Sequence, residues 1–314
     1  MTDGALAVTV AQLQFRNPIV LAAGTAGYGQ ELTGVIDLDA IGGLVTKAVS
    51  AEPRHGAPAP RVADFDEGMI NAVGLANPGL REVSGHQLPW LDAHFSGTRK
   101  LWNIVGFSVD EFAQVVRGLD EASVGHAHAV DGYELNVSCP NVKQGGTEFG
   151  ADPESLRQVV ARARAATKKP VFVKLSPTLA DIAGAARIAV DAGADGITVI
   201  NTMPGLVVDV EHRKPAVGFG SGGVSGPAIL PVGVLATWRV SRAVKVPVIG
   251  VGGVASGTDA LQYVIAGASL VGVGTAALRD PRAPERIVSG MRDWCARHGV
   301  KSVSELRGTL KWPA

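Results

Sequence analysis

Short apolar runs alternate along this chain with longer amphipathic runs. Apolar runs of this length are typical of buried parallel strands, and the amphipathic runs have the spacing of helices that bury one face. We expect strands at residues 18–22, 41–45, 101–106, 132–138, 171–175, 196–200, 246–251 and 270–273. We expect helices at residues 109–118, 152–167, 182–192, 229–244 and 258–266. This alternation predicts an α/β fold, a (β/α)₈ TIM barrel.

Two long stretches interrupt the alternation. Residues 52–77 begin proline-rich and continue without a regular pattern, and residues 203–226 are rich in glycine. Each follows an expected strand, so both are predicted to be irregular insertions at the carboxyl-end face, where long excursions are usually functional. Residues 8–15 predict a short hairpin at the opposite end. Because no linker or break in composition divides the chain, we expect one domain spanning residues 1–314.

Composition narrows the classes of partner. Lys plus Arg and Asp plus Glu are equal at 29 each, so no net field favours nucleic acid or an acidic membrane surface. Two distant cysteines, Cys139 and Cys295, argue against a disulfide framework and cannot alone hold an iron–sulfur cluster, which usually takes four thiolates. No apolar run approaches the roughly 20 residues of a membrane span, and no signal peptide is evident. We expect a cytoplasmic protein.

Polar side chains stand at the ends of several expected strands, where barrels build active sites. Lys47 follows the second strand and Asn103 lies within the third. A buried amide without a partner costs about 1–3 kcal/mol, which favours a ligand or a polar network around Asn103. Lys174, deep in the fifth strand, needs an anion.

Glycines after the last two strands point to a phosphate. Gly252-Gly253 and Gly274-Thr275 leave backbone N–H groups exposed at loop and helix starts, which is how barrels hold phosphates. A phosphate site combined with an inward-facing Lys174 and strand-end amides suits flavin mononucleotide (FMN). Reduced flavin carries negative charge near N1, which a buried lysine would stabilise.

The stretch from Tyr133 to Gly146 carries the strongest chemical signal. It predicts a strand, which Pro140 and Gly145-Gly146 end, followed by a loop. Cys139 is predicted to lie on that loop. A thiol there is placed for chemistry, although a small buried cysteine beside turn-forming asparagines is the alternative. The run Asn136-Val-Ser-Cys-Pro-Asn-Val-Lys, followed by two glycines, closely resembles the catalytic segment of class 1 dihydroorotate dehydrogenases, in the form of subclass 1B.

A second segment carries the same resemblance. Residues 71–79, Asn-Ala-Val-Gly-Leu-Ala-Asn-Pro-Gly, resemble the family's substrate loop. Val73 stands for the isoleucine and Ala76 for the glutamine of the family pattern. Neither difference removes an asparagine or a glycine from the loop.

The resemblance implies two overlapping sets of binding residues. It implies that FMN is bound by Ala23, Lys47, Ala48, Asn103, Asn136, Lys174, Ile200, Gly226, Gly252, Gly253, Gly274 and Thr275. It implies that the substrate is bound by Lys47, Asn71, Ala72, Val73, Gly74, Leu75, Asn136, Asn201 and Thr202. Ala23 replaces an expected serine, so only a backbone contact remains there. Asparagines offer donors and acceptors to the flat amide ring of dihydroorotate, and Lys47 with the backbone near Gly74 can hold its carboxylate.

The mechanism implied by the resemblance centres on Cys139. As a thiolate it removes a proton from C5 of dihydroorotate while hydride passes from C6 to FMN, giving orotate for pyrimidine biosynthesis. Cys295 is expected only to pack. Subclass 1B further implies a homodimer within a heterotetramer, whose iron–sulfur flavoprotein subunit carries FAD and a [2Fe–2S] cluster and passes electrons to NAD.

Several alternatives stay open. Subclass 1A enzymes resemble this chain and reduce fumarate as homodimers, whereas class 2 is disfavoured because it uses a catalytic serine and an N-terminal extension. A dihydropyrimidine-type dehydrogenase shares the barrel and the cysteine loop, but Asn141-Val142-Lys143 argues against it. A flavin-free lyase could use Lys174 as a Schiff base. A non-catalytic barrel that only binds a phospholigand is disfavoured by the Cys139 loop.

Overall fold

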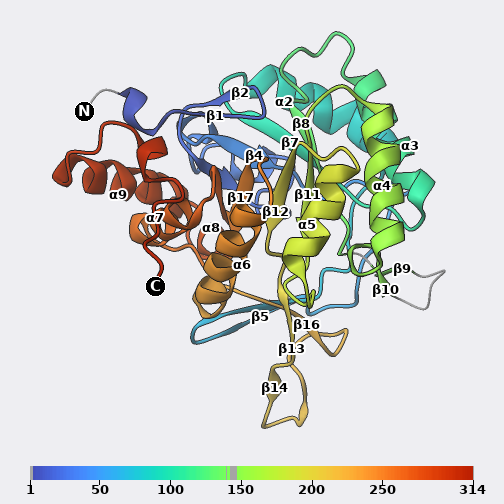
Figure 1. The fold of residues 1–314 in the computed structure, drawn as a ribbon. Coiled ribbons are helices and arrows are strands. Elements are labelled where there is room, and N and C mark those ends of the chain that lie inside the picture. Colours follow the sequence, from blue (N-terminus) through green and yellow to red (C-terminus); the bar gives the residue numbers. More distant parts are fainter. Residues whose placement is uncertain (1–2, 139, 142–146, 314) are drawn as a thin grey trace.

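Eight parallel strands close into a barrel in the computed structural model of the protein, which describes residues 3–138, 140–141 and 147–313. Each strand pairs with the next, and pairing of the last strand with the first completes the ring. Figure 1 shows helices packed around these strands. The prediction of a (β/α)₈ TIM barrel is therefore confirmed. In chain order its strands are β3 (Ile19–Leu21), β4 (Gly43–Val45), β7 (Arg99–Ile104), β8 (Gly132–Asn136), β11 (Val171–Leu175), β12 (Gly196–Val199), β17 (Val248–Val251) and β18 (Leu270–Val273).

The five helices that the sequence pattern predicts all form, and further helices join them. Those that cover the barrel are α3 (Val109–Ala122), α4 (Pro153–Ala166), α5 (Ile182–Asp191), α6 (Leu230–Ala243), α7 (Gly257–Ala266), α8 (Thr275–Arg279) and α9 (Ala283–Arg297). A further helical segment that the sequence analysis did not predict runs through α1 (Leu80–Glu82), a π-helical turn (Val83–Gln87) and α2 (Leu88–His94). Short 3₁₀ turns complete the chain at Asp3–Leu6, Gln30–Leu32, Leu38–Ala40, Phe149–Ala151, Pro227–Ile229 and Val303–Leu306.

Side-chain caps fix where the helices begin. The side chain of Ser108 accepts a hydrogen bond from Glu111 N at the start of α3, and Asp152 accepts one from Ser155 N at the start of α4. Ser256 forms a full capping box with Asp259 at the start of α7. Each cap satisfies a backbone donor that the first helical turn leaves unpaired. Residues at the turns before these helices therefore specify where each helix begins.

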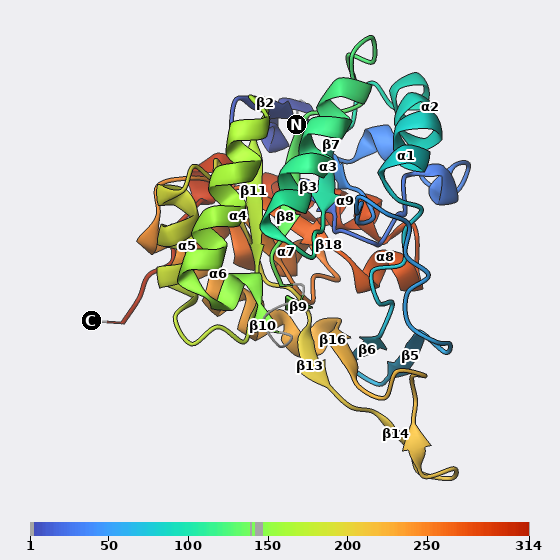
Figure 2. The ribbon, with the colours of Figure 1, turned by 90° about the vertical axis from the view of Figure 1, so that its right-hand side faces the viewer.

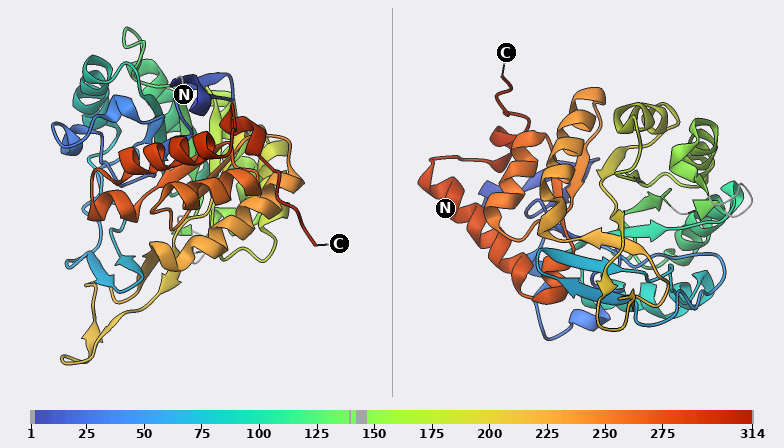
Figure 3. Two further views of the ribbon diagram at one scale, coloured as in Figure 1. Left: turned by 90° about the vertical axis from the view of Figure 1, so that its left-hand side faces the viewer. Right: turned by 90° about the horizontal axis from the view of Figure 1, so that it is seen from below.

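Short parts of the two long insertions, for which the sequence predicts no regular pattern, pair with one another in one antiparallel sheet. The sheet has the order β13 (Met203–Gly205), β16 (Gly222–Ser225), β6 (Gly68–Asn71), β5 (Val62–Phe65). It lies across the carboxyl end of the barrel, at the bottom of Figure 1 and facing the viewer in the right-hand view of Figure 3. Glycine is required at the central contact, because a Cβ on Gly222 would lie 2.4 Å from Asn71 O.

Three small hairpins complete the fold. The hairpin of β1 (Val8–Val10) and β2 (Leu13–Phe15) forms as predicted, at the barrel end opposite the antiparallel sheet (Figure 1). A second, of β14 (Val208–Asp209) and β15 (Lys214–Pro215), extends away from the barrel in Figure 2. A third pairs β9 (Pro140–Asn141) with β10 (Thr147–Glu148). Among the described residues, no helix has the length and apolar character needed to cross a bilayer.

Asn17 ties the amino ends of β3 and β4 together. Its Nδ2 donates to Ala40 O at 2.9 Å, and its Oδ1 accepts from Ile19 N at 3.1 Å and from Gly42 N at 3.0 Å. The side chain is 3% exposed, so water cannot replace these bonds. One amide thus holds the spacing of two neighbouring barrel strands.

We expect Asn17→Ala to lower the free energy of unfolding by about 2–3 kcal/mol, because it removes the three hydrogen bonds that this buried side chain forms with the backbone. Thermal unfolding followed by circular dichroism measures the loss. Gln158→Ala is the matched control, since Gln158 is exposed and hydrogen-bonds only Glu154 among the described residues. That control should change stability by less than about 0.5 kcal/mol. Equal effects of the two substitutions would contradict the role given to Asn17.

Candidate active site

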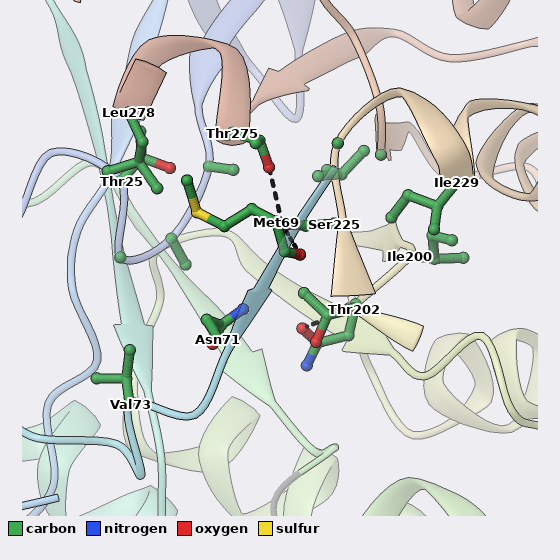
Figure 4. A pocket seen from close by; sticks show the side chains of 18 of the residues that line it. Thr25, Met69, Asn71, Val73, Ile200, Thr202, Ser225, Ile229, Thr275 and Leu278 are labelled. Carbon is green, nitrogen blue, oxygen red and sulfur yellow. Dashed lines mark hydrogen bonds between the residues drawn. The ribbon is translucent and has the colours of Figure 1, made fainter. Parts of the chain in front are cut away.

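A cavity of about 540 Å³ lies between the carboxyl ends of the barrel strands and the antiparallel sheet. Every described residue of the two predicted binding sets lines it. These residues are Ala23, Lys47, Ala48, Asn71, Ala72, Val73, Gly74, Leu75, Asn103, Asn136, Lys174, Ile200, Asn201, Thr202, Gly226, Gly252, Gly253, Gly274 and Thr275. Cys139 lies outside the described residues. The structure thus brings together side chains that are far apart in the sequence, and Figure 4 shows several of them around the cavity.

Lys174 supplies a buried positive charge. It is 7% exposed and faces Asn136 of β8 and Thr198 of β12 in the parallel registers of β11. No residue in the described part of the chain forms a hydrogen bond or an ion pair with its ammonium group. A desolvated ammonium group needs an anionic or strongly polar partner. Lys174 is therefore suited to bind a ligand that is negatively charged or becomes so.

Asparagines from the barrel and from the antiparallel sheet form a polar wall of the cavity. Asn201, just after β12, donates through Nδ2 to Oδ1 of Asn136 at 3.3 Å, and its own Oδ1 accepts from Thr202 N at 2.9 Å. Asn71 of β6 donates through Nδ2 to Gly223 O at 3.1 Å, which ties it to the antiparallel sheet. These bonds orient the amides from both the barrel and the sheet. Amides fixed in this way can recognise a ring that carries both N–H and C=O groups.

Glycine loops after β17 and β18 form another part of the cavity wall. Gly252 and Gly253 have φ values of 133° and 74°, in the region that favours glycine, and a Cβ on Gly253 would lie 2.7 Å from Leu230 N. Tyr263 fixes this loop by donating its hydroxyl to Gly252 O at 2.6 Å, and burial raises the pKa of that phenol, so it stays protonated. The loop brings bare backbone to the cavity surface, as a phosphate group requires.

Several lining residues were not predicted from the sequence. Thr275 Oγ1 and Ser225 Oγ hydrogen-bond at 2.8 Å, drawn in Figure 4, and so join α8 to the antiparallel sheet. Arg279 Nη2 reaches the same sheet at Gly68 O, 2.7 Å away. The new lining side chains labelled in Figure 4 are Thr25, Met69, Ser225, Ile229 and Leu278. Three of them are apolar, and a flat aromatic ring needs such walls.

Glu134 of β8 is a further polar residue that the sequence analysis assigned no role. It is 1% exposed, and Asn103 Nδ2 donates to its Oε1 at 2.8 Å. Asn103 lines the cavity, whereas Glu134 does not. The signal that could have found it is an acidic residue inside an otherwise apolar, fully buried strand, which must have a hydrogen-bond partner.

Of the two cysteines, only Cys295 lies among the described residues. Ser138, the residue before Cys139, lines the cavity, and its buried Oγ hydrogen-bonds no group in the described part of the chain. Cys295 is fully buried in α9, and burial raises the pKa of its thiol. The packing role predicted for Cys295 agrees with this environment.

The amino-acid sequence matches the family model described as dihydroorotate dehydrogenase over residues 5–294. The chain is 46% identical over 306 residues to the dihydroorotate dehydrogenase B (NAD(+)) catalytic subunit of Pelobacter propionicus, with 98% of each chain covered. It is 45% identical over 307 residues to the protein of the same name from Trichlorobacter lovleyi, covering 98% of this chain and 99% of the relative. A Solibacter usitatus protein provisionally named dihydroorotate dehydrogenase A (fumarate) is 43% identical over 307 residues, with 98% and 99% covered.

A solved structure of similar fold is dihydroorotate dehydrogenase from Eimeria tenella in complex with ferulenol. It superposes with a TM-score of 0.82 at 22% identity, covering 98% of this chain and 88% of that one. At this identity the likeness supports the barrel fold alone. The family follows from the full-length sequence matches: the chain belongs to the dihydroorotate dehydrogenase family, and its named relatives at 45–46% identity are of the NAD-linked B type.

Proposed function

We propose that this protein oxidises dihydroorotate to orotate with FMN in pyrimidine biosynthesis, as the catalytic subunit of an NAD-linked enzyme. The observation that carries the proposal is the single cavity lined by every described residue of the two predicted binding sets. Its volume of about 540 Å³ lies within the range of small-molecule and cofactor sites. Relatives that are 45–46% identical over their whole length carry the name of this enzyme.

The residues present fit FMN. Lys174 offers an ammonium group that no described residue neutralises, and Gly252 and Gly253 offer backbone at the cavity wall. FMN, when bound, supplies the hydride acceptor of the reaction. Lys174 would favour its reduced, more negative form, and Asn103 would hydrogen-bond it. The residues proposed to bind FMN are all those that the family resemblance implies, and Ala23 would contribute only its backbone.

The proposed substrate site combines Lys47 with the amides of the polar wall. Lys47 follows β4, where its backbone N donates to Gly27 O at 2.7 Å, and its side chain lines the cavity. Its ammonium group and the backbone near Gly74 would hold the carboxylate of dihydroorotate, while Asn71 and Asn136 would bind the ring. Cys139 would remove the proton from C5 as hydride leaves C6.

The proposal extends to the assembly. A single barrel domain spanning residues 1–314 would form a homodimer within a heterotetramer, in the cytoplasm and without nucleic acid or membrane. The partner subunit would be an iron–sulfur flavoprotein carrying FAD and a [2Fe–2S] cluster. The support is that the named relatives are catalytic subunits, which implies a second subunit in those enzymes. Two cysteines cannot supply the four thiolates of such a cluster.

The first test is the absorption spectrum of the purified chain, followed by anaerobic addition of dihydroorotate. We expect flavin bands that bleach on addition, because electrons move from the substrate to the bound flavin. Colour without bleaching would retain the flavin and reject dihydroorotate. A colourless protein that takes up no FMN would contradict the proposal, and borohydride trapping of Lys174 with a keto substrate would then test the lyase alternative.

We expect Cys139→Ser to retain FMN and to bind orotate while losing turnover near neutral pH by about a hundredfold or more. A serine hydroxyl is a much weaker base than a thiolate, so the remaining activity should rise with pH. Cys295→Ala is the matched control, since Cys295 is buried in α9 away from the cavity. It should leave turnover unchanged. Normal turnover of Cys139→Ser at pH 7 would exclude Cys139 as the base.

The electron acceptor is tested separately, because the fumarate name of the Solibacter usitatus relative keeps a second candidate open. We expect the isolated chain, once reduced by dihydroorotate, to be reoxidised slowly by both NAD⁺ and fumarate. Addition of the iron–sulfur flavoprotein subunit should make NAD⁺ the faster acceptor. Rapid turnover of the isolated chain with fumarate would instead assign the fumarate-linked type.

A further inference from the structure

Glu134 is an acidic side chain buried inside the barrel, one layer below the cavity. On β8 and β11, Asn136 faces Lys174 in register, and both line the cavity. Two residues earlier on the same strands, Glu134 faces Phe172. Because side chains alternate along a strand, Glu134 lies on the same interior face, one layer deeper. It is 1% exposed and does not line the cavity.

Its hydrogen bond determines how the side chain of Asn103 is turned. Asn103 faces Glu134 in the register of β7 and β8, and its Nδ2 donates to Glu134 Oε1 at 2.8 Å. A carboxylate oxygen accepts hydrogen bonds, so it selects the NH₂ end of the amide. Oδ1 of Asn103 is then turned away from Glu134. No residue of the described ranges 3–138, 140–141 and 147–313 donates to Oδ1, and Asn103 lines the cavity.

Stability alone gives no reason for this pair. Barrel interiors of this kind are normally filled by branched apolar side chains. Replacing a buried polar pair by apolar residues of similar volume is often neutral or stabilising. Glu134 and Lys174 form no ion pair within 4.0 Å in the described structure, so the pair of Glu134 and Asn103 is not explained by a salt bridge either. The effect of Glu134 that remains is the orientation of Asn103.

The orientation matters because of what a flavin ring can offer. The oxidised isoalloxazine ring has carbonyl oxygens and imine nitrogens that accept hydrogen bonds, and its N–H donor is at N3. The ammonium group of Lys174 and the backbone N–H groups of the glycine loops are donors that suit the acceptors. An acceptor such as Asn103 Oδ1 suits N3–H. A rotated Asn103 would present NH₂ and oppose the N–H donor of the ring.

We propose that Glu134 is a positioning residue for cofactor recognition: it holds the Asn103 amide with Oδ1 toward the cavity, so that Asn103 accepts a hydrogen bond from the flavin N3–H. This inference rests on the proposed FMN function. Glu134 acts through Asn103 and touches neither cofactor nor substrate.

The test measures dissociation constants of the apoprotein for FMN and for 3-methyl-FMN, which lacks the N3–H donor, by quenching of flavin fluorescence. In the wild type, 3-methyl-FMN should bind about fivefold to tenfold more weakly, the loss of one hydrogen bond. Glu134→Leu should weaken FMN binding by a similar factor, because Asn103 is then free to rotate. In that variant the penalty for the methyl group should fall to about twofold or less.

Two variants serve as controls. Glu134→Gln keeps an oxygen that can accept from Asn103 Nδ2, so it should restore FMN binding to within about twofold of the wild type. Thr198→Val removes a buried hydroxyl that has no hydrogen-bond partner in the described structure, on the interior face opposite Lys174. It should leave both dissociation constants unchanged, which separates the orientation of Asn103 from a general loosening of the barrel.

A double-mutant comparison tests whether Glu134 affects FMN binding through Asn103. In an Asn103→Ala background, Glu134→Leu should weaken FMN binding no further, because the side chain through which Glu134 acts is gone. A further fivefold loss in that background would overturn the inference. So would a wild type that binds FMN and 3-methyl-FMN equally, a measurement that needs no variant to fold. A wild type that binds neither flavin would instead overturn the proposed function itself.

Discussion

Closure of the barrel is the constraint on which the rest of the structure depends. Backbone pairing between β18 and β3, with Val271 opposite Ile19, turns an open parallel sheet into a ring without edges. Because all strands run in the same direction, every segment that follows a strand emerges at one end. Lys174, Asn136 and Asn201 come from three different strands and meet there. The common direction of the strands therefore decides where these side chains meet, and the side chains then decide what the cavity can bind.

The antiparallel sheet adds a wall that the barrel alone cannot provide. Its central pair joins β6 to β16, segments about 150 residues apart, and Asn71 Nδ2 donates across that pair to Gly223 O. Thr275 and Arg279 fasten the sheet to the end of β18. The position of Asn71 over the cavity thus depends on contacts from two other parts of the chain. A loop without such pairing would leave the amide with many orientations and a large entropy of ordering.

The sequence predicted most of the barrel because its signals are local. Continuous apolar runs, capped helix starts such as Ser108 and Asp152, and alternation along the chain give each element independently. The position of Lys47, Asn103 and Lys174 in or after the strands then predicted a polar site, and the family resemblance added Asn71, Asn136 and Asn201. The antiparallel sheet could not be predicted in this way, since its strands lie within stretches that have no regular pattern and one of them is glycine-rich. Its pairing is a tertiary contact that leaves no periodic pattern in either segment.

Glu134 and Lys174 show why single residues inside strands are hard to interpret from sequence. Both lie on the interior face of neighbouring strands, offset by one diagonal position, yet no ion pair within 4.0 Å joins them in the described structure. A direct ion pair with Glu134 would neutralise the ammonium group that Lys174 presents to the cavity. Separated by one layer, the carboxyl group binds Asn103 and the ammonium group remains available at the cavity wall. A shift of one residue in the register of β8 would turn Glu134 toward the helices. The strand pairing of the barrel therefore places Glu134 where it can bind Asn103 without reaching Lys174.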